Sequence, residues 1–297
     1  MTWGAVARMG YVAMHSSDLA NAVDHAQKIL GLTETGRSGN AVFLSSAARL
    51  HHELVYLDAP ENAVGHFGLA ANGIAGLDTV RRRVKDAGLK IVANTPLLPG
   101  VADGFSFIGP EGFIYEIFVD MESASYVPSP HRPERYGHIN LHPKDASAYK
   151  DFLINILDFK LCDVIGDGFA YFLRCNTEHH GVALISGRGW MHHHAWQVQS
   201  LVQLGELADR LWESRSRLLM GPLRHGESGR NIAAYYVEPT GAVVELYADM
   251  RHIYDNNAPV NYMSADTIDW ATQWSKYDPT EFRSHGVFPA TEMIASR

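Results

Sequence analysis

The sequence is poor in cysteine, in long apolar stretches and in clustered positive charge. Only two cysteines, Cys162 and Cys175, occur among 297 residues, and neither belongs to a Cys-x-x-Cys pair. A disulfide framework and a thiolate zinc site are therefore not expected. No apolar run approaches the ~18 residues that would indicate a membrane-spanning helix, and the N-terminus lacks the apolar core of a signal peptide. We therefore expect a cytoplasmic protein with no membrane partner.

The charge balance excludes a further class of partner. The chain carries 25 Lys and Arg against 33 Asp and Glu, a formal net charge of −8, and no basic cluster is interleaved with aromatic residues. Nucleic-acid binding is therefore not expected. A hydrophobic share of 46% and a charged share of 20% are typical of a folded protein, and the length allows two domains.

What the sequence does contain is an internal repeat. The matching segments are 9–18 with 136–145, His51-His52 with His179-His180, Gly65-His66-Phe67 with His193-His194-Ala195, and Glu116 with Glu245. The spacing between matched residues grows by only two across this span. So small a change indicates a duplicated domain.

Each half shows the same order of local signals. Apolar alternation predicts strands and 3.6-residue periodicity predicts helices, with expected helices at 18–30 (N-capped by Asp18), 77–87, 146–156 and 201–215. The order indicates two βαβββ units in each half and an α+β fold of two tandem domains. The expected boundaries are 1–121 for a non-catalytic first domain, 122–135 for a proline-containing linker, 136–250 for the domain with the metal site, and 251–297 for a tail packing near that site. Within the tail, 266–277 is expected to form a short helix with Trp270 and Trp274 on one face.

The second half alone offers a set of metal ligands. His138, His194 and Glu245 fall in register with Tyr11, His66 and Glu116 of the first half. His138 and His142 share a strand face but lie roughly 13 Å apart, so they cannot bind one ion. His192 and His194 share a face while His193 is expected to point away, and the repeat register selects His194.

The pattern of residue types indicates the chemistry. Two imidazoles and one carboxylate can occupy one face of an octahedral metal and leave three positions open, as in non-haem Fe(II) oxygen chemistry. The first half has Tyr11 at the first ligand position and Pro96 near the place of His225, so a second metal site is not expected there.

The sequence resembles the type I extradiol ring-cleavage dioxygenases of the vicinal oxygen chelate superfamily. The most specific part is the block His225…Tyr235-Tyr236-Val237-Glu238-Pro239-Thr240-Gly241-Ala242-Val243-Val244-Glu245, and the likeness covers roughly residues 8–250. The resemblance implies cupped mixed sheets and a homo-oligomer. It also implies O2-dependent cleavage of a catechol ring next to the diol, in the degradation of aromatic compounds.

The resemblance also implies roles for individual residues. His138, His194 and Glu245 would hold Fe(II), with Mn(II) less common, and His180 would be the acid/base histidine. His225 and Tyr235 would lie beside the substrate oxygens, with Tyr236 as the alternative to Tyr235. The apolar residues expected around the ring are Phe172, Trp190, Met191 and Trp196.

The sequence leaves three other functions open. A glyoxalase-type isomerase or a keto-acid dioxygenase could use the same three residues. A glyoxalase would be expected to use four protein ligands and would not need His180 or Tyr235, and the keto-acid enzymes tend to be longer, with a different C-terminal helix over the site. A small-molecule-sequestering binding protein of the same fold would leave the three ligands unexplained, and the fold alone does not decide among these functions.

Overall fold

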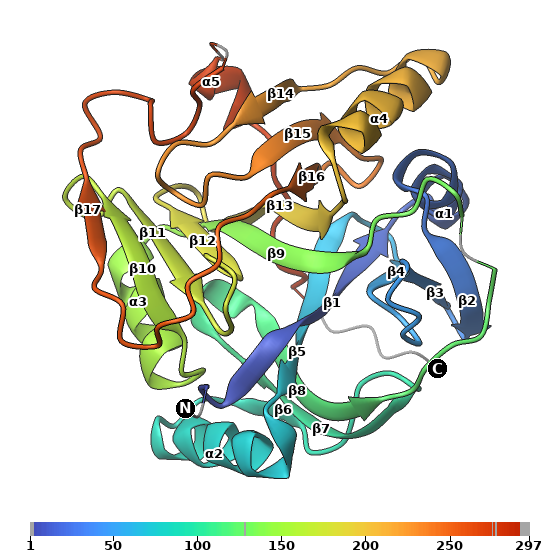
Figure 1. The fold of residues 1–297 in the computed structure, drawn as a ribbon. Coiled ribbons are helices and arrows are strands. Elements are labelled where there is room, and N and C mark those ends of the chain that lie inside the picture. The colour runs from blue at the N-terminus through green and yellow to red at the C-terminus, as the bar shows by residue number, and fades with distance from the viewer. Residues whose placement is uncertain (1–2, 128, 275, 277, 292–297) are drawn as a thin grey trace.

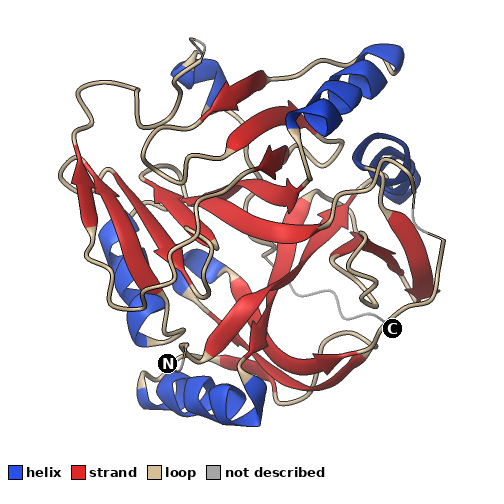
Figure 2. Cartoon of the chain, in the orientation of Figure 1, coloured by secondary structure: helices blue, strands red, loops and turns tan. Residues whose placement is uncertain are grey.

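Two large mixed sheets, one from each half of the chain, meet at the centre of the molecule, and the helices lie on the outside (Figures 1 and 2). The computed structural model describes residues 3–127, 129–274, 276 and 278–291. The first sheet, in the order β2-β3-β4-β1-β5-β8-β7-β6, comprises β1 (Val6–Ser16), β2 (Thr33–Ser38), β3 (Ala41–Ser45), β4 (Leu54–Asp58), β5 (Ala63–Ala71), β6 (Ile91–Ala93), β7 (Val101–Ile108) and β8 (Ile114–Met121). The second, in the order β14-β15-β16-β13-β9-β12-β11-β10-β17, comprises β9 (Arg135–His142), β10 (Lys160–Ile165), β11 (Ala170–Arg174), β12 (Val182–Ile185), β13 (Trp190–Gln197), β14 (Met220–Arg224), β15 (Ile232–Val237), β16 (Val243–Ala248) and β17 (Asn261–Met263).

Both sheets have the same internal plan. In the first, β1 is parallel to β4, β5 is parallel to β8, and β1 and β5 form an antiparallel pair at the centre. In the second, β9 with β12 and β13 with β16 are parallel, and β9 and β13 form the central antiparallel pair. Each sheet is therefore two strand–helix–three-strand modules joined at their first strands, which confirms the expected α+β fold.

The helices begin where the sequence supplies a cap. Asp18 accepts a hydrogen bond from Asn21 N at the start of α1, and Asp145 does the same for Ala148 N at the start of α3, which satisfies exposed first-turn amides. The helical elements are α1 (Leu19–His25), the π-helical turn η1 (Ala26–Leu30), α2 (Gly73–Asp86), the 3-10 turn η2 (Pro110–Gly112), α3 (Ala146–Asn155), α4 (Leu201–Glu213) and α5 (Pro279–Phe282). Within the described part of the chain, none of them has both the length and the apolar character needed to cross a bilayer.

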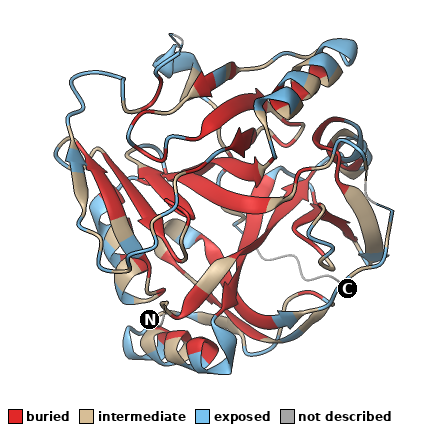
Figure 3. Cartoon of the chain, viewed as in Figure 1, coloured by how far each residue is buried: buried red, intermediate tan, exposed pale blue. Residues whose placement is uncertain are grey.

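One apolar core runs through both halves. Val12 of β1, Ile139 of β9 and Trp196 of β13 belong to the same buried cluster, and Figure 3 shows the central strands buried along most of their length. Tyr115 and Tyr149 link the halves through their hydroxyls at 2.6 Å. The two sheets therefore pack against each other through a shared core, which fixes the central strands and the side chains at their ends.

The C-terminal segment returns to both sheets. β17 adds to the edge of β10, Val287 forms a bridge with Met191 of β13, and Pro289 forms one with Val64 of β5. The helix expected over 266–277 is not formed in residues 266–274, so that prediction is wrong there; residues 275 and 277 lie outside the described residues. The carbonyls of Trp270 and Ala271 accept hydrogen bonds from the loop around 225–228 instead of from a following helical turn.

Candidate metal centre and active site

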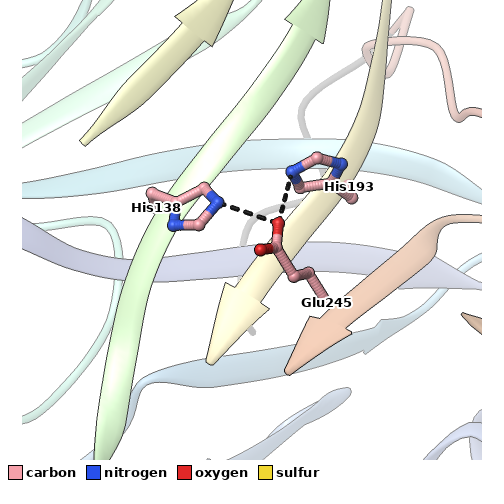
Figure 4. Close-up of side chains that lie close together, drawn as sticks. All are labelled: His138, His193 and Glu245. Carbon is pink, nitrogen blue, oxygen red and sulfur yellow. Dashed lines mark hydrogen bonds and ion pairs between the residues drawn. The ribbon is translucent and has the colours of Figure 1, made fainter. Parts of the chain in front are cut away.

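Three side chains from three neighbouring strands meet at one point of the second sheet. His138 comes from β9, His193 from β13 and Glu245 from β16, and all three are buried. Oε2 of Glu245 lies 3.0 Å from Nε2 of His138 and 3.1 Å from Nε2 of His193 (Figure 4). One ligand atom from each residue lies within 4.8 Å of the others, which is close enough for one ion.

The donor set fits a divalent metal. Nε2 of His193 is buried and approaches the same carboxylate oxygen as Nε2 of His138, so two imidazole nitrogens and one carboxylate oxygen converge on one point. Burial lowers the pKa of His193 to about 4 despite Glu245, so its imidazole is neutral. Burial acts to raise the pKa of Glu245, but His138 and His193 outweigh it and hold that pKa well below its usual value. A neutral imidazole and a carboxylate are the protonation states in which these groups bind metals.

The structure corrects one predicted ligand. His194 lies on the opposite face of β13, where its Nε2 is 3.4 Å from Oε1 of Glu238 and its Nδ1 accepts a hydrogen bond of 2.9 Å from Trp196 Nε1. The predicted placement of His194 beside His138 and Glu245 is therefore wrong, and His193, which was expected to point away, lies there instead.

The first half explains this error. Nε2 of His66 lies 2.8 Å from the Tyr11 hydroxyl, which in turn donates to Glu116, so Tyr11, His66 and Glu116 are the counterparts of His138, His193 and Glu245. The step from His180 to His193 is 13 residues, one fewer than the step from His52 to His66, whereas the repeat register assumes a steadily growing offset. Because side chains alternate along a strand, a shift of one residue exchanges its two faces.

His180 lies beside the metal ligands. Its ring centroid is 4.4 Å from that of His138, and its Nδ1 is 3.0 Å from Nδ1 of His179. Burial, and then the neighbouring His138, lower the pKa of His180 well below its usual value. His180 is therefore a neutral imidazole at the edge of the same cavity as the ligands.

His225 and Tyr235 form a hydrogen-bonded pair on the same cavity. Nδ1 of His225 lies 2.5 Å from the carbonyl oxygen of Ala271, which requires a proton on Nδ1. Nε2 of His225 therefore accepts from the Tyr235 hydroxyl, at 2.7 Å. Tyr236, the alternative, lies on the other face of β15 with its ring 5.4 Å from that of His25 and does not line the cavity.

These residues surround one cavity of about 200 Å³. Asn140 and the residues of the metal centre form its polar end, and the tail covers it through Trp270, Ala271 and Phe282. The apolar wall is formed by Phe169, Phe172, Ala183, Ile185, Met220, Ile268, Trp270 and Phe282.

Only one of the four apolar residues expected around the ring lines this cavity. Phe172 does, but Trp190 lines a separate surface groove, Met191 lies in the core, and Trp196 packs on Tyr136. The tail residues that take their place could not be assigned from the repeat, because the tail has no counterpart in the first half.

One cation in the cavity wall was not predicted from the sequence. Arg283 follows α5, donates to the carbonyl of Ser186 at 2.7 Å, and holds its guanidinium 5.2 Å from the centre of the Phe169 ring. Its Nε is buried with no hydrogen-bonding partner, and Arg283 makes no ion pair with any residue that the structure describes.

Comparison with known proteins agrees with this geometry. Residues 135–246 match the family model "Glyoxalase/Bleomycin resistance protein/Dioxygenase superfamily". A metapyrocatechase from Geobacillus stearothermophilus is 26% identical over 280 residues, which cover 84% of this chain and 82% of the relative.

Solved structures share the whole fold. A homoprotocatechuate 2,3-dioxygenase from Arthrobacter globiformis superposes with a TM-score of 0.90 at 22% identity, covering 100% of this chain and 96% of the other. A Mn(II)-bound glyoxalase from Novosphingobium aromaticivorans also gives a TM-score of 0.90, at 25% identity, covering 98% of each chain. Residues 135–246 thus carry the similarity to the glyoxalase/bleomycin resistance protein/dioxygenase superfamily, and the resemblance of the chain to the extradiol ring-cleaving dioxygenases is confirmed.

Proposed function

We propose that this protein is a metal-dependent extradiol dioxygenase, which opens a catechol ring with O2 next to the diol in the degradation of aromatic compounds. The observation that carries the proposal is the meeting of His138, His193 and Glu245 at the polar end of a largely apolar cavity that is also lined by His180, His225 and Tyr235. A sequestering protein would need the apolar wall but not these six polar side chains.

The metal site of this proposal is His138, His193 and Glu245, holding Fe(II), with Mn(II) as the alternative. Three protein ligands on one side leave three positions open, and a metal bound there would hold both catechol oxygens and O2 together. The Mn(II)-bound glyoxalase neighbour is the reason to test both ions.

His180 is the residue that takes a proton from the substrate. It is neutral, buried and adjacent to the ligand His138, so it can accept a hydroxyl proton as the catechol binds and return it later in the reaction.

Tyr235 and His225 position the ring from the other side. With the proton of His225 on Nδ1, the Tyr235 hydroxyl donates to His225 and presents its oxygen lone pair to the cavity, where a substrate hydroxyl can donate to it.

The cavity supports a substrate with one ring. An apolar cavity of about 150 Å³ holds a benzene molecule, and the cavity beside the metal ligands is about 200 Å³. We therefore propose monocyclic catechols with small substituents in preference to bicyclic ones.

A glyoxalase-type isomerase is the second candidate, because a glyoxalase is among the structural neighbours. Such an enzyme needs no dioxygen and gives no role to the His225–Tyr235 pair. A keto-acid dioxygenase would consume O2 but would not act on a catechol.

Oxygen uptake separates these functions. The protein is reconstituted anaerobically with Fe(II) or Mn(II) and supplied with catechol, 3-methylcatechol or 2,3-dihydroxybiphenyl, while O2 and product absorbance are followed. We expect one O2 consumed for each yellow ring-opened product, fastest with the monocyclic compounds and abolished in His193→Ala. Metal-loaded protein that consumes no O2 with any catechol, but isomerises a glutathione hemithioacetal, would replace the proposal with the second candidate.

A further inference from the structure

Both halves of the molecule contain a pair of adjacent histidines in contact through Nδ1. In the second half Nδ1 of His179 and Nδ1 of His180 are 3.0 Å apart, and in the first half the corresponding atoms of His51 and His52 are 2.9 Å apart. Such a contact needs a proton on one Nδ1 and a lone pair on the other. The pair alone does not determine which ring carries the proton.

In the second half a buried carboxylate lies in direct contact with the pair. Oδ2 of Asp163 lies 2.9 Å from Nε2 of His179, and both side chains are completely buried. Among the described residues, this close approach to His179 is the polar side-chain contact that the structure gives to the carboxylate of Asp163. Because an uncompensated buried carboxylate is costly, contact with the Nε2–H side of His179 is the arrangement that stabilises it.

The first half is an internal comparison that lacks this group. Asp163 of β10 pairs with Phe172 of β11, and the residue that pairs in the same way with Phe43 of β3 is Gly36. A Cβ at Gly36 would meet open space. The fold and the histidine pair thus form without a carboxylate at this position, so Asp163 is not a requirement of the module itself.

The carboxylate of Asp163 determines which nitrogen donates and which accepts in the contact between His179 and His180. A proton on Nε2 of His179, facing Asp163, leaves a lone pair on its Nδ1. That lone pair accepts Nδ1–H of His180, and His180 then has its own lone pair on Nε2. His180 lines the cavity beside His138, so this lone pair is available to a bound substrate.

We propose that Asp163 and His179 are positioning residues, which hold His180 in the tautomer with a proton on Nδ1 and a free Nε2. This inference rests on the proposed function, because His180 takes the substrate proton only in that reaction. Neither Asp163 nor His179 lines the cavity, so both act through His180.

Asp163→Asn tests the direction of the chain. The new amide can donate to Nε2 of His179, which moves the His179 proton to Nδ1 and leaves His180 with its proton on Nε2. We expect kcat to fall about 100-fold, within the range for loss of a general base. KM and the affinity for Fe(II) should stay within about twofold, since no ligand or cavity residue changes.

Substitutions at His179 give a second test that does not depend on the stability of the Asp163 variant. A glutamine there can donate to Asp163 and accept from His180, so His179→Gln should keep kcat within about fivefold, whereas His179→Leu should lose about 100-fold. The double variant Asp163→Asn with His179→Gln should recover activity relative to Asp163→Asn, because the glutamine amide can reorient. His51→Gln, the matched change in the first half, should leave kcat unaltered.

Anaerobic binding of 4-nitrocatechol supplies a readout other than turnover. This coloured catechol changes its visible spectrum on ionisation, and the wild-type complex should show the ionised form to a greater extent than the Asp163→Asn complex. Wild-type kcat and spectrum in Asp163→Asn, or equal kcat values in His179→Gln and His179→Leu, would overturn the inference. Loss of kcat that merely follows loss of bound metal or of folded protein would overturn it too. A wild-type protein that cleaves no catechol would instead remove the proposed function, and this inference with it.

Discussion

Nε2 of His193 lies 3.1 Å from Oε2 of Glu245, whereas its sequence neighbour His194 points to the other side of the same strand. The two sides have different chemistry. The His193 side faces the apolar cavity and two other ligands, while His194 lies between Glu238 and Trp196. Glu238 also accepts from Tyr56 of the first half at 2.5 Å, so His194 belongs to the contact between the halves.

Alanine substitutions at His193 and His194 should have different effects, because the two side chains lie on opposite faces of β13. We expect His193→Ala to lower Fe(II) and Mn(II) affinity by at least about 100-fold, since one of three protein ligands is lost. His194→Ala should bind one metal ion per chain but unfold at a lower temperature, because Glu238 loses a buried partner. Anaerobic metal titration with elemental analysis measures the first effect and thermal unfolding the second. Metal loss in His194→Ala with retention in His193→Ala would contradict the assignment.

Glu116 makes the stability of the first half depend on pH. Burial raises its pKa to about 7, although the hydrogen bond from Tyr11 opposes this. The folded state therefore holds the proton more tightly than the unfolded chain, whose carboxyl has a pKa near 4.5. The stabilisation is complete below pH 4.5 and is lost as the pH rises through 7.

Glu116→Gln removes this dependence. A pKa difference of this size corresponds to at most ~3 kcal/mol. The variant should equal the wild type in stability near pH 4.5 and exceed it by an amount approaching that limit above pH 8. Urea unfolding at a series of pH values measures the difference, with Glu61→Gln as an exposed control. A difference between variant and wild type that shrinks with increasing pH would contradict a raised pKa for Glu116.

Much of the fold could be predicted from the internal repeat. The choice between His193 and His194 could not, because the spacing between matched residues is not constant. Alternation and capping located the helix after Asp18 and the central strands, because those signals are local. The first-half counterparts identified His138 and Glu245. The step from His180 to His193 is one residue shorter than the step from His52 to His66, so the repeat register selected the wrong face of β13, and no local signal marks a face of a strand with three consecutive histidines.

The remaining site residues depend on long-range contacts. Trp270 and Arg283 reach the cavity because the tail pairs with β10 and β13, and that pairing has no counterpart in the repeat. Asp163 lies on a strand whose first-half equivalent carries Gly36, so comparison of the halves could not indicate a carboxylate there.

Tyr235 and Tyr236 offer another matched pair. Tyr235→Phe removes the hydroxyl next to His225, and we expect kcat to fall about tenfold or more with little change in metal affinity. The Tyr236 hydroxyl is buried with no hydrogen-bonding partner among the described residues, so Tyr236→Phe should leave kcat unaltered and stability equal or higher. Steady-state kinetics and thermal unfolding of the two variants test this, and equal kcat losses would remove the distinction.

We expect Arg283 to favour substrates with a negatively charged ring substituent. Its guanidinium is in the cavity wall with no ion-pair partner among the described residues, and a carboxylate on the ring substituent would supply one. We expect the ratio of kcat/KM for 3,4-dihydroxyphenylacetate over 4-methylcatechol to fall by about tenfold or more in Arg283→Leu, the equivalent of losing one charge-assisted hydrogen bond. Arg188→Leu is the control, because Arg188 stacks on Trp190 and lines only the separate groove. Because the ratio compares two substrates on one protein, a general loss of folded or metal-loaded enzyme cancels from it. A ratio unchanged in Arg283→Leu would therefore mean that this arginine only anchors the tail to Ser186 and does not contact the substrate.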